Sequence, residues 1–299
     1  MRASPLAAQG LGKRFRREWA LRDLTLTIPP GAIVGLAGPN AAGKSTLLAL
    51  AAGVLAPTEG SIAVFGHDPL ERPDVLGEVG YVAQGAPLYR SFRVAETIEY
   101  ARRTNFRWDA DIATELLTRI DSRTKVGALS AGERARLALA LALGKRPRLV
   151  LLDEPFASLD PLAARELLQL LMDGVAELAA TVVVASHVVA DIQRVCDHIV
   201  LVSGGCVRLE GDVEQLLESH RLLTGPRRPL GTIHGVREVV RERYSGRQLT
   251  LLAVTDGPIV DPSWTVHPVS LEELLLAYMA PERLPNVRPM ERIQLRWHG

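Results

Sequence analysis

Eight consecutive residues in the first quarter of the chain have the types and spacing that hold a phosphate group. They are Gly38, Pro39, Asn40, Ala41, Ala42, Gly43, Lys44 and Ser45, and they fit the pattern G-x-x-x-x-G-K-[ST] in full. The two glycines let the backbone curl so that successive N–H groups face one anion. The lysine adds a cation for the outer phosphates, and the serine hydroxyl is a ligand for Mg²⁺. We therefore expect this loop to bind a nucleoside triphosphate.

The residues on either side of the loop predict the elements that must position it. The apolar run Ile33 to Ala37 before the loop is typical of a buried strand. A helical run, 46–52, follows it and begins with Thr46, which extends the expected contact with phosphate. A helix that starts at the loop directs its N-terminal partial positive charge at the same anion.

A second acidic motif ends another apolar run. Residues 149–152 are all Leu or Val, and Asp153 and Glu154 follow them directly. Asp153 is placed to hold Mg²⁺, directly or through water. Glu154 is placed to orient or deprotonate an attacking water. Pro155 then ends the strand.

The wider pattern predicts an α/β protein. Runs typical of strands at 24–28, 33–37, 149–152 and 181–185 alternate with runs typical of helices, which favours a parallel sheet covered on both faces. Residues 85–143 lack such strand runs, and helices at 94–103 and 110–120 indicate an inserted helical subdomain. A stretch rich in Gly and Pro, 222–231, predicts a linker between an N-terminal domain at 1–221, which carries the phosphate loop, and a C-terminal region at 232–299.

The C-terminal region has its own predicted elements. Strands are expected at 236–243 and 248–254, with a turn at Ser245-Gly246 between them. Ser270 and Glu273 form a capping box ahead of a helix at 271–279. From Pro281 on, three prolines and four arginines predict poor order.

Composition excludes several classes of protein. The net charge of +1 gives no reason to expect nucleic-acid binding. The two cysteines, Cys196 and Cys206, have no spacing typical of a disulfide framework or a zinc site, which favours a reducing cytoplasm. No apolar run is long enough for a signal peptide or a membrane span. Any role at a membrane must therefore come through a partner.

Six motifs together resemble those of ATP-binding cassette (ABC) ATPases, in the order that this family uses. After the phosphate loop come Gln84, resembling the Q-loop, and Leu129-Ser130-Ala131-Gly132-Glu133, resembling the LSGGQ signature. The acidic strand, Ser158-Leu159-Asp160 (D-loop) and His187 (switch histidine) follow. The resemblance covers roughly residues 6–217. It implies a P-loop NTPase core with a mixed sheet, an inserted helical subdomain and a small α+β C-terminal extension.

The resemblance also implies the mechanism and the partners. Two such domains, here two copies of this chain, sandwich two ATP molecules with Mg²⁺. Ser130 and the Gly132 N–H then contact the γ-phosphate of the other copy, and Asp160 stabilises the facing site. His187 contacts the γ-phosphate, and Gln84 senses the metal and signals to separate membrane-spanning permease subunits. The chain is then cytoplasmic and peripheral on the inner face of the membrane.

An aromatic residue stacks on adenine in this family. Phe15 lies at the matching position and keeps the stacking face of the usual Tyr. Trp19 is the other candidate.

Two residues depart from the signature. Ala131 replaces the first of two glycines and adds a methyl group, and Glu133 replaces Gln and adds a negative charge. Both changes are expected to weaken dimer closure or slow turnover, while Ser130 and Gly132 remain.

The leading hypothesis is ATP hydrolysis coupled to transport. The connection Pro87-Leu88-Tyr89 after Gln84 resembles exporter ATPases and favours export over import. One alternative is a soluble ABC protein that acts on nucleic acid, but this sequence has one cassette and no sustained heptads. Another is a module that binds ATP without hydrolysing it, which the altered signature motivates. A simple kinase leaves residues Ser130 to Glu133 unexplained.

Overall fold

The computed structural model describes residues 3–227 and 233–279 of the chain. The chain forms two compact units. Unit 1 comprises Met1–Cys196 and Val202–Val207, and unit 2 comprises Asp197–Leu201 and Arg208–Gly299. The chain crosses between the units in its strands β8 (His198–Ser203) and β9 (Cys206–Asp212).

Unit 1 begins with an antiparallel sheet in the strand order β2-β1-β4. Its strands are β1 (Leu6–Phe15), β2 (Glu18–Ile28) and β4 (Glu59–Val64). Burial alternates along β1 and β2, as expected for strands with one face toward a core. The tight turn between them has Arg16 at φ 53° and pairs Phe15 with Glu18. Phe15 is thereby fixed at the tip of the hairpin that β1 and β2 form.

The second sheet has the strand order β5-β6-β7-β3-β8-β9. Its parallel part contains β5 (Val79–Val82), β6 (Leu149–Asp153), β7 (Thr181–Ser186) and β3 (Ile33–Ala37). Every residue of β6 and β7 is buried, which explains their continuous apolar sequences. Asp153 pairs with Ala185, and Ala37 pairs with Ser186. The chain therefore leaves β3, β6 and β7 at one edge of the sheet, where the three predicted functional segments begin.

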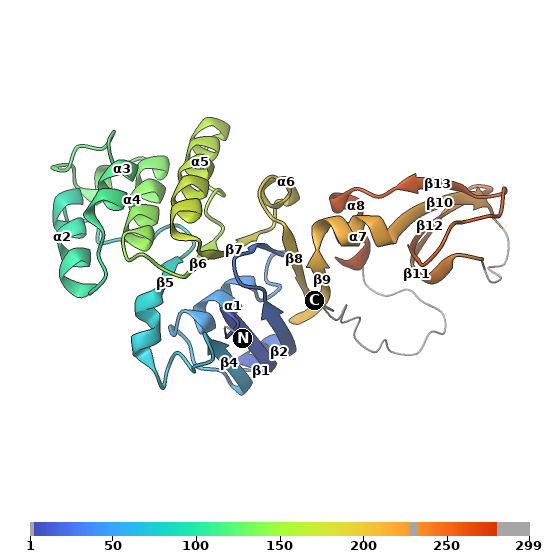
Figure 1. Cartoon of the computed structure of the whole chain (residues 1–299), viewed down its shortest axis with the longest axis horizontal. Coiled ribbons are helices and arrows are strands. Elements are labelled where there is room, and N and C mark those ends of the chain that lie inside the picture. Colours follow the sequence, from blue (N-terminus) through green and yellow to red (C-terminus); the bar gives the residue numbers. More distant parts are fainter. Residues whose placement is uncertain (1–2, 228–232, 280–299) are drawn as a thin grey trace. The chain divides into compact units, whose positions relative to one another are not determined.

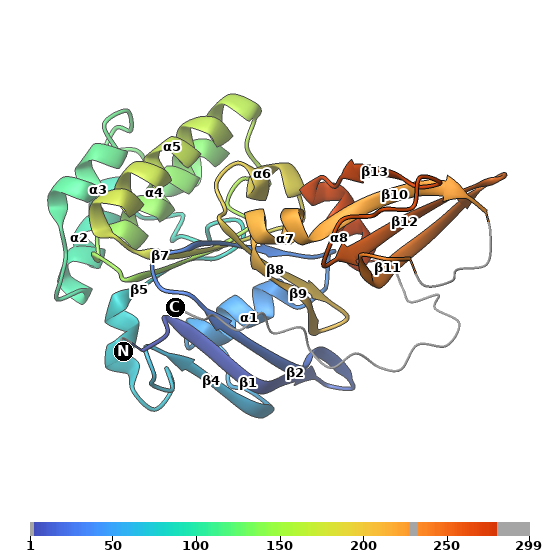
Figure 2. The same ribbon diagram turned by 45° about the vertical axis from the view of Figure 1, so that its right-hand side comes forward.

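Helices pack around these sheets in unit 1 (Figures 1 and 2). They are α1 (Lys44–Ala51), the 3₁₀ helix η1 (Pro73–Glu78), α2 (Val94–Thr104), α3 (Ala110–Leu116), the 3₁₀ helix η2 (Val126–Ala128), α4 (Ala131–Leu143), α5 (Pro161–Leu178) and α6 (Val189–Gln193). Helix α4 packs against α2, α3 and α5. Leu137 and Leu143 on α4 are fully buried in a core that also contains Leu152 and Leu171.

Helix α3 is shorter than the sequence pattern predicts. It ends at Leu116 rather than Ile120. The N–H of Leu117 bonds to the Thr114 carbonyl, and the N–H of Ile120 bonds to the Leu117 carbonyl. These bonds span three residues, so the chain tightens into turns where the apolar pattern alone would continue the helix.

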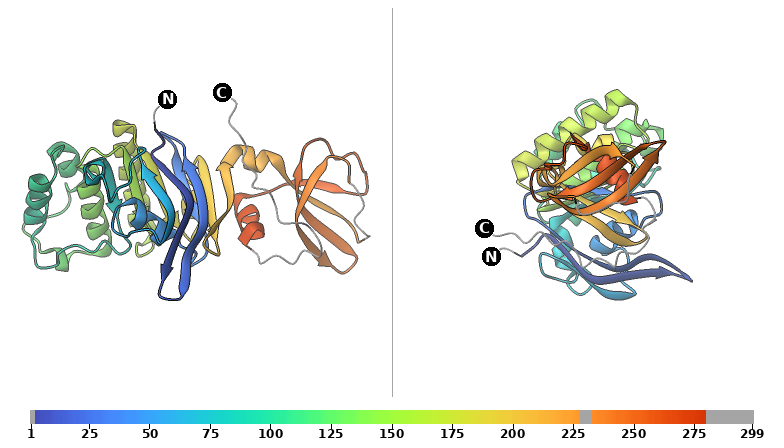
Figure 3. Two further views of the ribbon diagram at one scale, coloured as in Figure 1. Left: turned by 90° about the horizontal axis from the view of Figure 1, so that it is seen from below. Right: turned by 90° about the vertical axis from the view of Figure 1, so that its right-hand side faces the viewer.

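Unit 2 contains an antiparallel sheet in the order β11-β12-β10-β13 (orange and red in Figure 3). Its strands and helices are α7 (Val213–Ser219), β10 (His220–Pro226), β11 (Val236–Ser245), β12 (Gln248–Thr255), β13 (Thr265–Pro268) and α8 (Leu271–Met279). Leu223, Leu249, Leu251 and Trp264 form its buried core with Ala253. Helix α8 has the predicted bounds. Ser270 and Glu273 form the predicted capping box, in which the Ser270 N–H and Oγ–H donate to Glu273 Oε2 over 3.0 and 2.7 Å.

Part of the stretch expected to be a linker is a strand. Residues 222–226 belong to β10, because Leu223 is buried in the core of unit 2 and the whole segment pairs with β12. Residues 228–231 of that stretch lie outside the described residues, as does the tail from Pro281. The predicted domain limits stay a prediction. Within the described ranges, no helix is both long enough and apolar enough to cross a bilayer.

Candidate functional site

The loop from Gly38 to Ser45 connects β3 to α1 and requires glycine at both glycine positions of its pattern. Gly38 has φ 153°, and a Cβ there would lie 2.1 Å from the Val202 carbonyl oxygen. Gly43 has φ 104°, and a Cβ there would lie 2.5 Å from the Ala20 carbonyl oxygen. No other residue fits these contacts, so the tight path of the loop depends on both glycines.

Lys44 turns back into its own loop. Its Nζ donates to the carbonyl oxygens of Gly38 and Pro39 over 2.7 and 3.1 Å. Nζ also lies 3.8 Å from Glu154 Oε1, and both side chains are more than nine-tenths buried. Burial lowers the pKa of Lys44, whereas the carboxylates of Glu154 and Asp153 oppose that shift. The ammonium is thus poorly solvated and ready to pair with a stronger anion.

Ser45 and Asp153 bring two oxygen ligands together across 108 residues of sequence. Ser45 Oγ donates to Asp153 Oδ1 over 2.9 Å. Burial raises the pKa of Asp153, while the bonds from Ser45 and the Gln84 backbone amide and the charge of Lys44 act in the opposite direction. Oxygen donors of this kind fit Mg²⁺, and a bound cation would favour the ionised carboxylate. Mg²⁺ in proteins usually keeps several waters and binds substrate phosphates, which suits a site with two protein oxygens. Among residues 3–227 and 233–279, no group of three or more His, Cys, Asp or Glu side chains could hold a metal ion.

Glu154 and His187 meet although they follow different strands. Nδ1 of His187 lies 2.9 Å from both Oε1 and Oε2 of Glu154. An ionised carboxylate only accepts hydrogen bonds, so Nδ1 carries the proton. Glu154 has φ 50°, an unusual backbone for a residue other than glycine, and its N–H donates to the Ala185 carbonyl of β7 over 3.0 Å. Its carboxylate is therefore held in place from both the main chain and the side chain.

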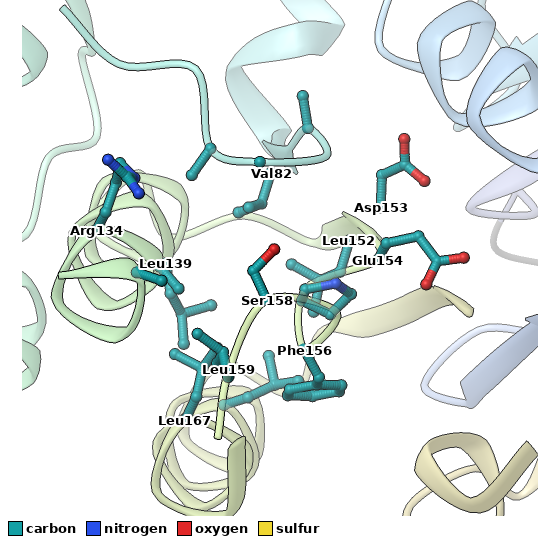
Figure 4. A pocket seen from close by; sticks show the side chains of 17 residues that line it. Val82, Arg134, Leu139, Leu152, Asp153, Glu154, Phe156, Ser158, Leu159 and Leu167 are labelled. Carbon is teal, nitrogen blue, oxygen red and sulfur yellow. The ribbon is translucent and has the colours of Figure 1, made fainter. Parts of the chain in front are cut away.

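Figure 4 shows Asp153 and Glu154 near each other, across the pocket from Arg134. Next to Glu154 lies a cavity of about 110 Å³. Its apolar wall includes Leu139, Leu152 and Leu167, and Ala131 at the start of α4 also borders it. The signature segment and the acidic strand therefore share one cavity.

The signature residues form the start of α4. Ser130 is its N-cap, and Glu133 completes a capping box with it. A Cβ on Gly132 would lie 3.4 Å from the Ala163 side chain, which is ordinary contact. The signature segment thus lies against the start of α5.

Asp160 has a similar local role, because its Oδ1 accepts from the N–H groups of Leu162 and Ala163, both over 3.0 Å, and caps α5. The side chain of Gln84 is exposed in the loop after β5.

The rings of Phe15 and Trp19 differ in how far they are exposed for stacking on a base. The side chain of Phe15 is 46% exposed, and Lys13 Nζ lies 5.2 Å from its ring centroid. Trp19 is half-buried, and a Cβ on Gly12 would lie 3.0 Å from its ring. Phe15 therefore presents the more open face for stacking.

Five of the predicted residues make hydrogen bonds or ion pairs with one another in two groups, one of Ser45 with Asp153 and one around Glu154. These residues are Lys44, Ser45, Asp153, Glu154 and His187. Sequence reasoning missed Asp191, whose pKa is raised by burial and by the charge of Glu154 and lowered by Arg194 and His187. Asp191 lies in the first turn of α6.

Comparison with known proteins assigns the family. The ABC transporter family matches residues 21–157. The ABC transporter ATP-binding protein YtrB of Bacillus subtilis is 32% identical over 70% of this chain and 73% of its own length. The sulfate/thiosulfate import ATP-binding protein CysA of Bacillus cereus is 33% identical over 71% of this chain and 62% of its own length. The lipopolysaccharide export system ATP-binding protein LptB of Haemophilus influenzae is 30% identical over 73% of this chain and 95% of its own length.

Solved structures agree with this assignment. The structure of the dimeric bacterial ABC transporter cassette MJ0796 superposes on this chain with a TM-score of 0.63 and 26% sequence identity. The match covers 70% of this chain and 98% of the MJ0796 chain. The same cassette in a post-hydrolysis state with ADP and Pi gives a TM-score of 0.62 at 26% identity. The chain therefore belongs to the ABC transporter ATP-binding family, and the predicted α/β fold class is confirmed. It is the ATPase subunit of a transporter, a class that works with transmembrane permeases and dimerises.

Proposed function

We propose that this chain binds ATP at the loop from Gly38 to Thr46, with the adenine stacked on Phe15. The observation that carries the proposal is the cluster of buried and partly buried charged groups at the common edge of β3, β6 and β7. In this proposal Lys44 leaves the Gly38 and Pro39 carbonyls for the β- and γ-phosphates. The buried ammonium donates to two neutral carbonyl groups, and its one carboxylate partner lies 3.8 Å away. By moving to the phosphates it would exchange neutral acceptors for charged ones, which form stronger hydrogen bonds.

Hydrolysis is assigned to Glu154 and His187. The Glu154 carboxylate takes a proton from the attacking water, and the bond from His187 Nδ1–H holds the carboxylate in orientation. His187 Nε2 then faces the reacting phosphoryl group. The residues that would hold Mg²⁺ are Ser45 and Asp153, with Gln84 as an outer ligand, and the ion would neutralise phosphate charge.

Two copies of the chain form composite sites in this proposal. Ser130, Ala131, Gly132 and Glu133 of one copy lie against the triphosphate bound by the other, and Asp160 stabilises the facing site. The support is that Ser130 is exposed at the start of α4 and that the related cassette MJ0796 is dimeric. Donors at a helix start are suited to a γ-phosphate.

A groove near Gln84 is proposed to receive the permease. Its volume is about 590 Å³, and its lining includes Val82, Ala83, Tyr89, Tyr100 and Lys145. Tyr89 and Tyr100 are 67% and 55% exposed. We propose that an apolar helical segment of the permease, at the cytoplasmic face of the membrane, covers these rings. The groove lies beside the Q-loop, so its occupant is placed to sense the ATP site.

Export is the proposed direction of transport. It rests on the short Pro87-Leu88-Tyr89 connection after Gln84, and the relatives include both import and export proteins. Reconstitution with the permease in vesicles tests it. Export predicts that substrate on the ATP side stimulates hydrolysis without a separate solute-binding protein, whereas dependence on such a protein contradicts it.

The core proposal is tested by ATP turnover of the wild-type chain and of Glu154→Gln, with and without the permease. Loss of turnover in the variant with retained ATP binding supports it. Equal turnover in both proteins would show that another group activates the water.

A further inference from the structure

Glu133 holds the hydroxyl proton of the signature serine. Oε2 of Glu133 accepts from Ser130 Oγ over 2.8 Å and from the Ser130 N–H over 2.9 Å. In return, the Glu133 N–H donates to Ser130 Oγ over 3.2 Å. The hydroxyl has one proton, and in this conformation that proton is directed at a carboxylate of the same chain.

In the composite site the same proton is required elsewhere. Ser130 would donate it to the γ-phosphate on the facing copy, so the carboxylate and the phosphate compete for one donor. Two acceptors that each lie within about 2.8 Å of one oxygen are at most about 5.6 Å apart. Both carry negative charge, and contact between the two copies excludes part of the water that would screen them.

We propose that Glu133 is an autoinhibitory positioning residue, which occupies Ser130 until ATP displaces it and thereby raises the ATP concentration needed for closure of the dimer. This inference rests on the proposed composite site. Closure breaks the bond from Ser130 Oγ–H to Glu133 Oε2 and forms one to phosphate. The Ser130 N–H remains available to hold the displaced carboxylate near the start of α4.

Glutamine at this position would remove the conflict. A glutamine carbonyl can still accept from Ser130, which keeps the cap of α4, but it is neutral and does not repel phosphate. Glu133→Gln therefore separates the charge from the capping function.

The chain contains a matched control in α8. Ser270 and Glu273 form the same box, with bonds of 3.0, 2.7 and 3.2 Å, in unit 2. These bonds from Ser270 also lower the pKa of Glu273. Glu273→Gln removes one charge from an equivalent cap that has no proposed contact with nucleotide.

The experiment measures the ATP midpoint of dimerisation in the Glu154→Gln protein with Mg²⁺, by light scattering. Adding Glu133→Gln is expected to lower the midpoint about three- to tenfold, and adding Glu273→Gln is expected to leave it unchanged. Because the effect is electrostatic, the difference in midpoint between the proteins with and without Glu133→Gln should shrink in high salt. Circular dichroism verifies that α4 is retained, and Glu133→Ala serves as a second uncharged variant that must shift the midpoint in the same direction.

Each outcome has one meaning. An unchanged or higher midpoint in both uncharged variants overturns the role of Glu133 while the composite site stands. A Glu154→Gln protein that binds ATP but stays monomeric overturns the composite site, and this inference with it. An equal shift in Glu273→Gln would show a general effect of net charge and also overturns the proposal.

Discussion

Nδ1 of His187 lies 2.9 Å from each carboxylate oxygen of Glu154, and this contact joins the ends of β6 and β7. The two contacts fix the direction of the Glu154 carboxylate. A carboxylate that is already oriented requires less reorganisation when a water is activated beside it.

Glu154→Gln is expected to reduce the rate of ATP turnover by about 10²- to 10⁴-fold, because the amide cannot accept the water proton. ATP binding is expected to survive, so an ATP-bound dimer should accumulate. Turnover assays and size-exclusion chromatography with ATP and Mg²⁺ measure both effects. Dimer formation without loss of turnover would contradict the assignment of the base.

His187→Ala is expected to lower kcat by about 10²-fold with a smaller effect on KM, because it removes the group that orients the Glu154 carboxylate. The side chain is 41% exposed, so the fold should tolerate its loss. Steady-state kinetics separates the two parameters. A rise in KM alone would show that His187 acts in binding rather than in the chemical step.

Lys44→Ala is expected to weaken ATP binding by at least about tenfold, since one charge-assisted bond to phosphate is lost. Adenosine should bind equally to both proteins, because it lacks the phosphates. Equilibrium dialysis with ATP, ADP and adenosine makes the comparison. Equal loss for all three ligands would indicate a damaged loop instead.

Phe15→Ala is expected to weaken ATP binding by about five- to 100-fold, in line with the usual contribution of one base–aromatic stack. Phe15→Tyr keeps the ring face and should retain affinity. Trp19→Ala is the matched control, because its ring packs against Gly12. A larger effect of Trp19 than of Phe15 would reassign the stacking residue.

The stability of unit 2 should fall as the pH drops through the usual His range. Nδ1 of His220 lies 2.7 Å from the Leu216 carbonyl and Nε2 lies 2.9 Å from the Tyr278 hydroxyl, so the neutral ring donates to one and accepts from the other. Burial lowers the pKa of His220, and nearby Arg237 and Arg221 lower it further, although the bond to Leu216 opposes them. Between the lowered folded pKa and about 6.5, the unfolded chain therefore binds more protons.

Full stability from His220 is thus present above about pH 6.5 and is lost below it. Amide hydrogen exchange in β10 and α8, followed from pH 7.5 to 5.5, measures the effect. His220→Gln should flatten the pH dependence, and a dependence that is unchanged in this variant would assign it to other groups.

The sequence predicted the elements that carry the site because their signals are local. The phosphate loop, the strand before it and the capping box of α8 each depend on residues within a few positions of one another. The end of α3 and the strand β10 were not predicted. Helix α3 ends in turns whose bonds span three residues, and β10 forms because Leu223 packs against Leu249 and Leu251.

Within the site, too, single motifs could be predicted from local sequence, whereas contacts between distant residues could not. Motif order indicated Lys44, Glu154 and His187 separately, yet their contacts link residues 33 to 110 positions apart. The sequence likewise marked Glu133 as a departure from the family pattern. The S-x-x-E spacing of Ser130 and Glu133, the same as that of Ser270 and Glu273, was the signal for the bond from the Ser130 hydroxyl to the Glu133 carboxylate that the structure shows.

The parallel pairing of β3, β6 and β7 has a consequence for how the enzyme is inactivated. These strands are buried, and each carries one functional segment at the same end. The reacting groups are therefore attached to buried main chain, which opens only when the sheet opens. Heating should abolish turnover only when the sheet itself unfolds, so the loss of activity and the loss of protected amides in these strands should follow one curve.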